Sequence, residues 1–497
     1  MRVIREKKLL LSIAFMAMGT SVSTNVLSMD LYVNTKTKQI YTESGPDREL
    51  IGSFEKTGDA TPVTPVVDRT IGLKTKAEKA QLLGRVDAME EKFTTGVVAK
   101  GDENGLQLES ADGNFKFKLG GRIHTDMSYS PGDKYLRAHS NGAKQYANDG
   151  NEIRRARIDL VGTVYKDWNF KSQVDFADNA VAIKDMYVGY GGFDKIGENW
   201  GIDHIRIGNQ KQAFSHEMLQ SSNDMLFQER SLMNVLNYKM IDRAIGINVH
   251  ASGKGWTGWT AQAGLYGGSP KPSADPSSKD EGYGTSARVT LSPIEEKGKL
   301  LHFGLAGNYR RPSGSGAVND TNTGVNLEYE TTHMTDLLPM NKTITNVESI
   351  AMLGLEANAI HGPLSVGGEY TSMWISRNNL TPYHFNAWYG EAALSLTGES
   401  RNYKKGVMMR LEPAQNFSFA KGGLGAWELA ARVGGVSLNN NNLNGGEMKV
   451  VTAGLNWYAN KNIRFTVNYD KAISANGLLV DNMKKLNTVM FRSQIAF

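Results

Sequence analysis

The sequence contains no cysteine among its 497 residues, which excludes disulfides, thiolate chemistry and cysteine-based metal sites. It also lacks an apolar run long enough for a membrane-spanning helix, because its most apolar stretch, 9–18, has ten residues and a span needs roughly 20. None of the nine histidines has the H-E-x-x-H spacing of a zinc site, and no glycine-rich segment has the strand-to-helix context of a phosphate-binding loop. We therefore expect neither a cofactor nor a metal, and no enzymatic activity.

What the chain does have at its start is an export signal. Residues 1–28 combine a basic segment (Arg2, Arg5, Lys7 and Lys8) with the apolar stretch and with small residues before Met29, as in a secretory signal peptide. The formal net charge is +5, of which 1–28 contribute +3. The charge of the remaining chain is therefore nearly balanced and indicates no particular partner; we expect no nucleic-acid binding.

Residues 29–104 differ from the rest and are predicted to be a periplasmic segment. Residues 61–68 (TPVTPVVD) are typical of an extended linker. Residues 74–93 have helical composition with a weak apolar stripe. This short helix is either a coiled coil below an oligomeric barrel or a surface helix in a partly disordered tail, and the sequence leaves both open.

From residue 105 to 497 the chain alternates between apolar and polar side chains. Ile158 and Leu160 share one parity, against Arg157 and Asp159 on the other, and the pattern resumes after a turn at 166–167. Because side chains of a strand point to opposite faces with period two, this pattern predicts a barrel with lipid outside and water inside. The predicted fold is therefore all-β, a transmembrane antiparallel β-barrel. At about 25 residues for each strand and its connection, the region holds about 16 strands.

The ends of the strands give further expectations. Short turns on one side and longer loops on the other, at 126–152, 209–243, 268–284, 311–347 and 438–447, are typical of the bacterial outer membrane. The last strand ends on Phe497, an aromatic residue of the kind that the outer-membrane assembly machinery recognises. We therefore predict export to the outer membrane and contact with its lipid.

Alternation also sorts the charged residues, and the inward positions of the clearest strands carry an excess of cations. Rings of Arg and Lys favour anions in a pore, and the planar fork of Arg suits phosphate. The inward residues are ten basic ones (Lys116, Lys118, Arg122, Arg155, Arg157, Lys171, Arg206, Arg432, Arg464, Arg492) and six acidic ones (Asp126, Asp159, Asp175, Asp185, Glu428, Asp470).

A series of motifs in this region resembles the phosphate-selective porin O/P family. Each motif alone is modest, but together and in this order they cover nearly all of 105–497. They are LGGRIHTD (119–126), RRARI (154–158), YKDWNF (165–170), DFAD (175–178), IKDMY (183–187), IGNQKQAFS (207–215), QERS (228–231), LTGESR (396–401), GAWEL (425–429) and GLNWY (454–458).

The resemblance implies a homotrimer of 16-stranded barrels that passes inorganic anions, phosphate among them, through a pore narrowed by an inward-folded loop at about 212–243. It also implies an anion site at that constriction, in which an acidic residue weakens binding so that ions leave. The site residues carried over, together with those from parity, are Arg122, Arg154, Arg155, Arg157, Lys171, Asp185, Lys211, Ser215 and Arg230.

Two departures limit the comparison. The family's tight phosphate binders have an alternating arginine ladder at the entrance, and the corresponding stretch here offers only Arg288, Arg310 and Arg311. Alternation along its strand places Arg154 on the lipid-facing side, so a position in the lumen requires a bulge or the end of the strand. The alternative function is therefore a general or differently selective porin without tight phosphate binding, and surface adhesion by the loops stays open as an added role.

Overall fold

The computed structural model describes residues 29–34, 40–41, 44–54, 96–102, 105–193, 201–267, 282–312, 324–335 and 337–497. The predicted signal peptide, 1–28, and the predicted helix, 74–93, lie outside these residues. The chain divides into two compact units, 1–86 and 87–497. In the first unit, β1 (Met29–Asn34) pairs antiparallel with both β2 (Ile40–Tyr41) and β3 (Arg48–Phe54), giving a small three-stranded sheet.

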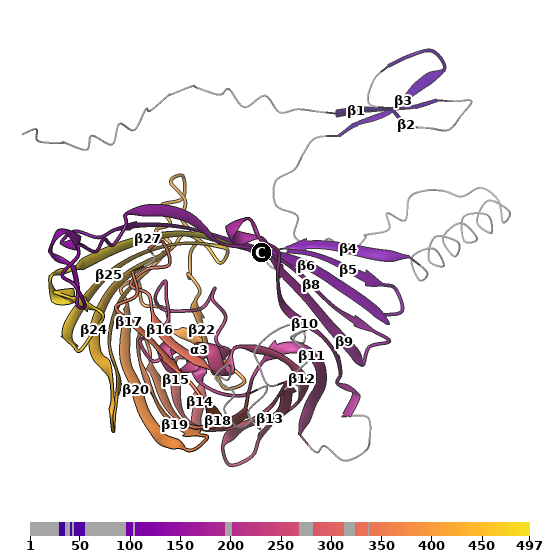
Figure 1. Cartoon of the computed structure of the whole chain (residues 1–497). Coiled ribbons are helices and arrows are strands. Elements are labelled where there is room, and N and C mark those ends of the chain that lie inside the picture. Colours follow the sequence, from indigo (N-terminus) through magenta and orange to yellow (C-terminus); the bar gives the residue numbers. More distant parts are fainter. Residues whose placement is uncertain are drawn as a thin grey trace, which may run out of the picture. The chain divides into compact units, whose positions relative to one another are not determined.

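The second unit is a closed antiparallel barrel of sixteen strands, as the sequence predicts (Figure 1). Neighbouring strands along the chain pair with one another, and the last pairs with the first. The strands are β6 (Phe115–Tyr129), β8 (Gly150–Val164), β9 (Trp168–Asp175), β10 (Ala182–Tyr190), β11 (Ile202–Lys211), β12 (Arg243–Lys254), β13 (Gly258–Gly267), β14 (Tyr283–Glu296), β15 (Lys299–Arg311), β18 (Val347–His361), β19 (Leu364–Arg377), β20 (Leu380–Ser395), β23 (Ala426–Asn440), β24 (Leu443–Tyr458), β25 (Ile463–Asn476) and β27 (Asn487–Ala496).

The barrel closes between β27 and β6, and glycines make the closure possible. Gly121 and Phe497 exchange two backbone hydrogen bonds, of 2.9 and 3.1 Å. A Cβ on Gly120 would lie 2.6 Å from the Phe497 carbonyl oxygen, so only glycine fits there. A hairpin of β4 (Val97–Asp102) and β5 (Gly105–Ser110) pairs with the first residues of β6. The sheet therefore begins at Val97 and not at the predicted residue 105.

The two faces of the barrel differ as the alternation predicts. Its outer face exposes large apolar side chains such as Ile158, Val289, Phe303 and Leu355. Its inner face is so polar that arginines are among the largest fully buried side chains. A wall with apolar residues outside and charges inside fits a barrel in a lipid bilayer. Among the described residues, no helix is both long enough and apolar enough to cross a membrane.

The connections follow the predicted asymmetry with several exceptions. The barrel end at which β6 begins and β27 ends is the periplasmic one, because most of its turns are short. The predicted loop at 438–447 is wrong: β23 and β24 continue through it and pair Asn439 with Asn444 around a tight turn at Asn441, whose φ is +48°. The long connection 396–425 lies at the periplasmic end and was not predicted.

The inside of the barrel contains several folded-in segments (Figure 1). The connection 212–242, here called the constriction loop, carries α2 (His216–Leu219) and α3 (Asn234–Ile241). Two hairpins lie inside as well: β16 (Val325–Tyr329) with β17 (Met340–Ile344), and β21 (Arg401–Lys404) with β22 (Val407–Leu411). A further pair, β7 (Arg137–Ala138) with β26 (Val480–Asp481), joins two extracellular loops.

Candidate functional site

The constriction loop is held against the two sides of the lumen by different contacts. On one side its apolar residues join a large buried cluster that includes Leu236 of α3, Leu327 of β16 and Phe385 of β20. The inner faces of β18–β20, β23 and β24 are here called the packed wall. On the other side the loop meets the inner faces of β6 and β8–β12, here called the charged wall. The predicted site residues all lie on the charged wall or on the loop.

The base of the loop is fixed by Lys211 and Ser215. The Lys211 ammonium donates to the carbonyl oxygens of Leu219 and Gln220, at 3.1 and 2.8 Å. Ser215 has a φ of +62°, and its hydroxyl accepts the backbone N–H of Met218 at the start of α2. Both predicted residues therefore shape the loop, and the half-buried Lys211 places its ammonium at the base of the loop.

Arg154 and Arg155 both enter the lumen because β8 has a bulge at this point. Thr125 of β6 pairs with Ile153 and His124 pairs with Arg155, so two residues of β8 stand opposite one of β6. Ile153 is exposed on the outer face, while Arg154 is half-buried and Arg155 is buried. The bulge that the lumen position of Arg154 requires is present.

The two arginines of this bulge have different partners. Arg154 donates to both carboxylate oxygens of Glu229 on the constriction loop, at 3.0 and 3.3 Å. Arg155 lies 3.4 Å from Nδ1 of His124 and forms no ion pair with a carboxylate among the described residues. Burial alone would raise the pKa of Glu229, but Arg154, Arg155 and Arg492 hold it well below its usual value. Glu229 is therefore ionised and ties the loop to the wall.

Arg122 and Arg157 continue the basic surface on β6 and β8. Arg122 donates to the hydroxyls of Ser221 and Ser222 on the loop, at 3.1 and 3.0 Å, and to Asp159 at 3.3 Å. Arg157 donates to Asp175 at 2.7 Å. The guanidinium and hydroxyl groups together resemble the donors that an oxyanion needs.

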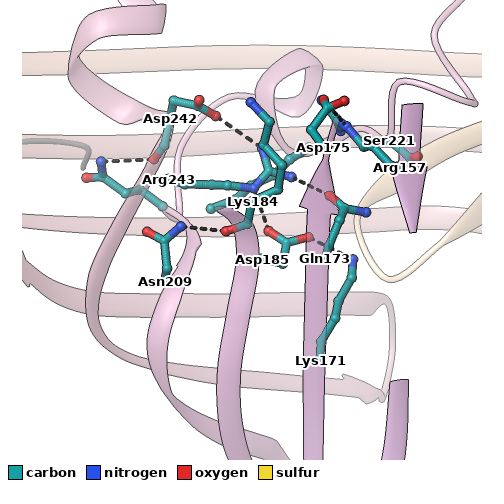
Figure 2. A network of polar contacts seen from close by, with 12 residues as sticks. Arg157, Lys171, Gln173, Asp175, Lys184, Asp185, Asn209, Ser221, Asp242 and Arg243 are labelled. Atoms are coloured by element: carbon teal, nitrogen blue, oxygen red, sulfur yellow. Dashed lines mark hydrogen bonds and ion pairs between the residues drawn. The ribbon is translucent and has the colours of Figure 1, made fainter. Parts of the chain in front are cut away.

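A second bulge, in β10, brings Lys184 and Asp185 into the lumen together. Ile183 pairs with Val174 and Met186 pairs with Ser172, so both residues stand opposite Gln173 alone. The Asn209 side chain donates to the Lys184 carbonyl oxygen at 2.5 Å, which satisfies a backbone group that the bulge frees (Figure 2).

Asp185 is clamped between two cations (Figure 2). It accepts from Lys171 of β9 and from Arg243 of β12, each at 2.7 Å. Lys184 has no hydrogen bond or ion pair from its ammonium within the described part of the chain. Two cations and two acids lie within electrostatic reach of it: Arg157, Arg243, Asp175 and Asp242. The Lys184 charge is thus available to a passing anion.

Arg230 lies on the constriction loop itself. Its Nε donates to the carbonyl oxygen of Glu217 at 3.2 Å, and its charge lies within electrostatic reach of Lys211. The Glu217 carboxylate is occupied by Ser231 and by Arg432 of β23. Arg230 therefore contributes a cation from the loop side, facing those of the wall.

Sequence reasoning missed Lys184 and Arg243. Lys184 is next to the inward Asp185, so strict alternation assigns it to the lipid face. Arg243 follows the long loop directly, where no earlier residue sets the parity. The signal that could have found them is a pair of adjacent charged residues, which occurs at Lys184–Asp185 and again at Asp242–Arg243. Two adjacent charges in a strand indicate that both side chains avoid the lipid.

The hairpin β21–β22 narrows the lumen from the periplasmic end and touches the constriction loop. The backbone N–H of Met408 donates to Nε2 of His216 at 2.9 Å. Burial lowers the pKa of His216 to about 3, so its ring is neutral and able to accept. At the tip of the hairpin, Lys405 donates to Asp203 of β11 at 2.6 Å. The hairpin thus crosses the lumen and supports the loop from below.

Several arginines outside the charged wall are paired with carboxylates, as Arg154, Arg157 and Arg243 are on it. Arg288 pairs with Glu356 at 2.5 Å, Arg401 with Glu428 at 2.7 Å, and Arg492 with Asp126 at 2.6 Å. Such paired charges add little net field to the pore. Within the described residues, the cations without a carboxylate partner on the charged wall therefore decide the local sign of the potential.

The sequence resembles those of known proteins. A sequence model of the phosphate-selective porin O and P family matches residues 117–497. Porin O of Pseudomonas aeruginosa is 27% identical over 401 residues, which cover 74% of this chain and 86% of that protein. An uncharacterized protein of Caulobacter vibrioides is 26% identical over 370 residues, covering 73% and 69% of the two chains. Among solved structures, an anion-selective porin from Comamonas acidovorans aligns with a TM-score of 0.46 at 14% identity, covering 77% of this chain and 100% of that one.

Proposed function

We propose that this chain, which belongs to the phosphate-selective porin O and P family and forms a channel in the bacterial outer membrane, passes inorganic anions along the charged wall. Phosphate or a related oxyanion is among these anions. The observation that carries the proposal is the pair of bulges, which add Arg154 and Lys184 to the inward-facing cations. A low-dielectric wall focuses the field of such charges and raises the local concentration of anions.

The proposed anion site consists of Arg122, Arg154, Arg155, Arg157, Lys171, Lys211, Ser215 and Arg230, with Lys184 and Arg243 added. Asp185 has the role of weakening binding, because it neutralises Lys171 and Arg243 between which an anion would otherwise settle. Conduction needs a site that attracts an ion and still releases it.

The selectivity that we propose is for small anions in general, with modest phosphate affinity. Arg288 and Arg310, two of the three residues available for an entrance ladder, are buried in the wall at 1% and 2% exposure. Arg288 pairs with Glu356, and Arg310 donates to Gln212 and to the Gly267 carbonyl oxygen. Neither can form a ladder along the mouth, which supports weaker capture than in a tight phosphate binder.

Two further parts of the proposal concern assembly. We expect a homotrimer, as the family resemblance implies, and recognition of the terminal strand by the outer-membrane assembly machinery through Phe497. The Phe497 ring is half exposed at the barrel seam. Deleting Phe497 should lower the amount of folded protein in the membrane, and crosslinking should give trimers; monomers alone would refute the oligomeric part.

The test of the proposed function is planar-bilayer conductance of the purified protein in a KCl gradient, followed by titration with phosphate. A reversal potential of the anion-selective sign, with chloride current blocked by phosphate only at high concentration, is the expected result. Block at low concentration would show a tight phosphate site. Cation selectivity would refute the role of the charged wall.

A further inference from the structure

Three potential metal ligands from separate segments meet at the extracellular end of the charged wall. Glu152 is near the start of β8, and Asp178 lies in the short η2 (Ala177–Asn179) between β9 and β10. His333 lies in the connection after β16. One ligand atom from each residue lies within 4.8 Å of the other two. The sequence predicts no metal site because these residues are 26 and 155 positions apart and share no motif.

The contacts within this group leave one carboxylate oxygen with a long ion pair and no hydrogen bond from the described residues. His333 Nδ1 lies 2.8 Å from one Glu152 oxygen. The other Glu152 oxygen is buried and accepts no hydrogen bond from the described residues. The closest cation is Arg154, whose Nε is 4.0 Å away and which is already bound to Glu229 at 3.0 Å. A buried carboxylate oxygen without a donor is unfavourable unless a cation reaches it.

We propose that Glu152, Asp178 and His333 bind a divalent transition metal of the zinc class at the extracellular mouth. One imidazole and two carboxylates are ligands that Zn²⁺ accepts, with water in the remaining position. Metal–ligand bonds of about 2.1 Å in tetrahedral geometry place ligand atoms about 3.4 Å apart. The side chains of Asp178 and His333 are exposed, so neighbouring side chains do not enclose them.

Such a metal would act on the channel by position and charge. Glu152 pairs with Asp126 on the inner face of the wall, two residues before the bulge at Arg154. A bound divalent cation would fasten the connection that carries His333 to the rim of the charged wall. It would also add positive charge where anions enter, which strengthens their attraction.

The binding should depend on pH in a defined direction. A metal must displace the proton from the His333 imidazole, so the affinity falls as the pH drops and the ring becomes protonated. Metal binding that is unchanged between pH 8 and pH 5 would contradict an imidazole ligand.

The experiment is equilibrium dialysis of the full purified barrel with Zn²⁺, repeated with Co²⁺ to record the visible absorption of the bound ion. The variants are His333→Ala and Asp178→Asn. The control is His139→Ala, because His139 lies 3.0 Å from Asp481 in a more exposed pair of loops, which has no third ligand among the described residues.

The expected result is one saturable ion in the wild type and in His139→Ala, with affinity reduced at least tenfold in both site variants. Loss of the ion in His139→Ala as well, or equal binding by all four proteins, would overturn the proposal. All variants must show the wild-type heat-dependent gel shift, so that misfolding is separated from loss of a ligand. In bilayers, Zn²⁺ on the extracellular side should increase anion selectivity of the wild type and not of Asp178→Asn.

Discussion

The charged wall and the packed wall enclose the same lumen, and both make polar contacts with the constriction loop, but only the packed wall adds a large apolar cluster to them. The packed wall buries apolar side chains of α3 and of the hairpin β16–β17 against β18–β20. The charged wall meets the loop through ion pairs and hydrogen bonds such as Arg154 with Glu229 and Arg122 with Ser222. Apolar burial fixes the position of the loop. The polar contacts leave cations of the charged wall facing the open part of the lumen. The difference teaches that position and selectivity are built on separate sides of the pore.

The largest expected effect comes from loosening the packed wall. Leu236 of α3 is fully buried, and Leu236→Ala should cost about 2–5 kcal/mol of loop packing. The loop should then leave its place part of the time, and single-channel conductance should rise and become noisy. Leu305→Ala, on the lipid-facing side of β15, is the control and should leave conductance unchanged. Unchanged conductance in Leu236→Ala would show that the polar contacts alone hold the loop.

A smaller effect should come from the charged wall itself. Arg155→Ala removes a cation without a carboxylate partner, so the anion-to-cation permeability ratio should fall about fivefold, since one charge at about 4 Å in water contributes on the order of 1 kcal/mol. The reversal potential in a KCl gradient measures this ratio. Arg377→Ala removes the same charge from β19, where Arg377 donates to Thr345, and should change little. Equal shifts in both variants would mean that only total charge matters.

Removing the acid of the charged wall should act in the opposite direction. Asp185→Asn leaves Lys171 and Arg243 uncompensated, so phosphate should block chloride current at about tenfold lower concentration, or ~1.4 kcal/mol. Asp242→Asn is the control and should have a smaller effect, because Asp242 is more exposed than Asp185 and lies 3.5 Å from Arg243. Weaker block in Asp185→Asn would remove Asp185 from the proposed release role.

The smallest effect is expected from mild acid. Because the pKa of Glu229 is held well below its usual value, its contribution to loop anchoring is complete above that usual value and is lost only as the pH falls through the lowered one. Current noise should therefore be the same at pH 7 and pH 4.5. Glu229→Gln should produce at pH 7 the noise that the wild type shows only in stronger acid, and a wild-type change already at pH 5 would contradict this.

Much of the barrel could be predicted from sequence because alternation is a local property. Ile158 and Arg157 reveal their faces without any tertiary information, and Phe497 marks the closing strand. The inward-folded β21–β22 hairpin could not be predicted, since nothing in 396–425 shows that Lys405 will meet Asp203 of a distant strand. The partners of the site residues were equally hidden, because ion pairs such as Arg154 with Glu229 form only after the loop folds inward.

The positions where strict alternation fails are also where the wall gains charge. Alternation assigns Arg154 and Lys184 to the lipid, but each residue sits in a bulge. For Arg154 the family resemblance implied the lumen and therefore a bulge, whereas it implied no such position for Lys184. A bulge is invisible to parity until the pairing partner is known. Two consecutive charged residues within an otherwise regular strand were the only hint.

These bulges have a consequence for how such a pore changes over evolution. A regular strand offers the lumen one side chain in every two residues, and inserting a residue inverts every side chain that follows it. At Arg154 and at Lys184 the inserted residue is absorbed locally, and the strand beyond it keeps its faces. Deleting either residue would restore a regular ladder and remove one cation. Pore charge is thus adjustable by single-residue insertions and deletions, a kind of mutation that most strands do not tolerate.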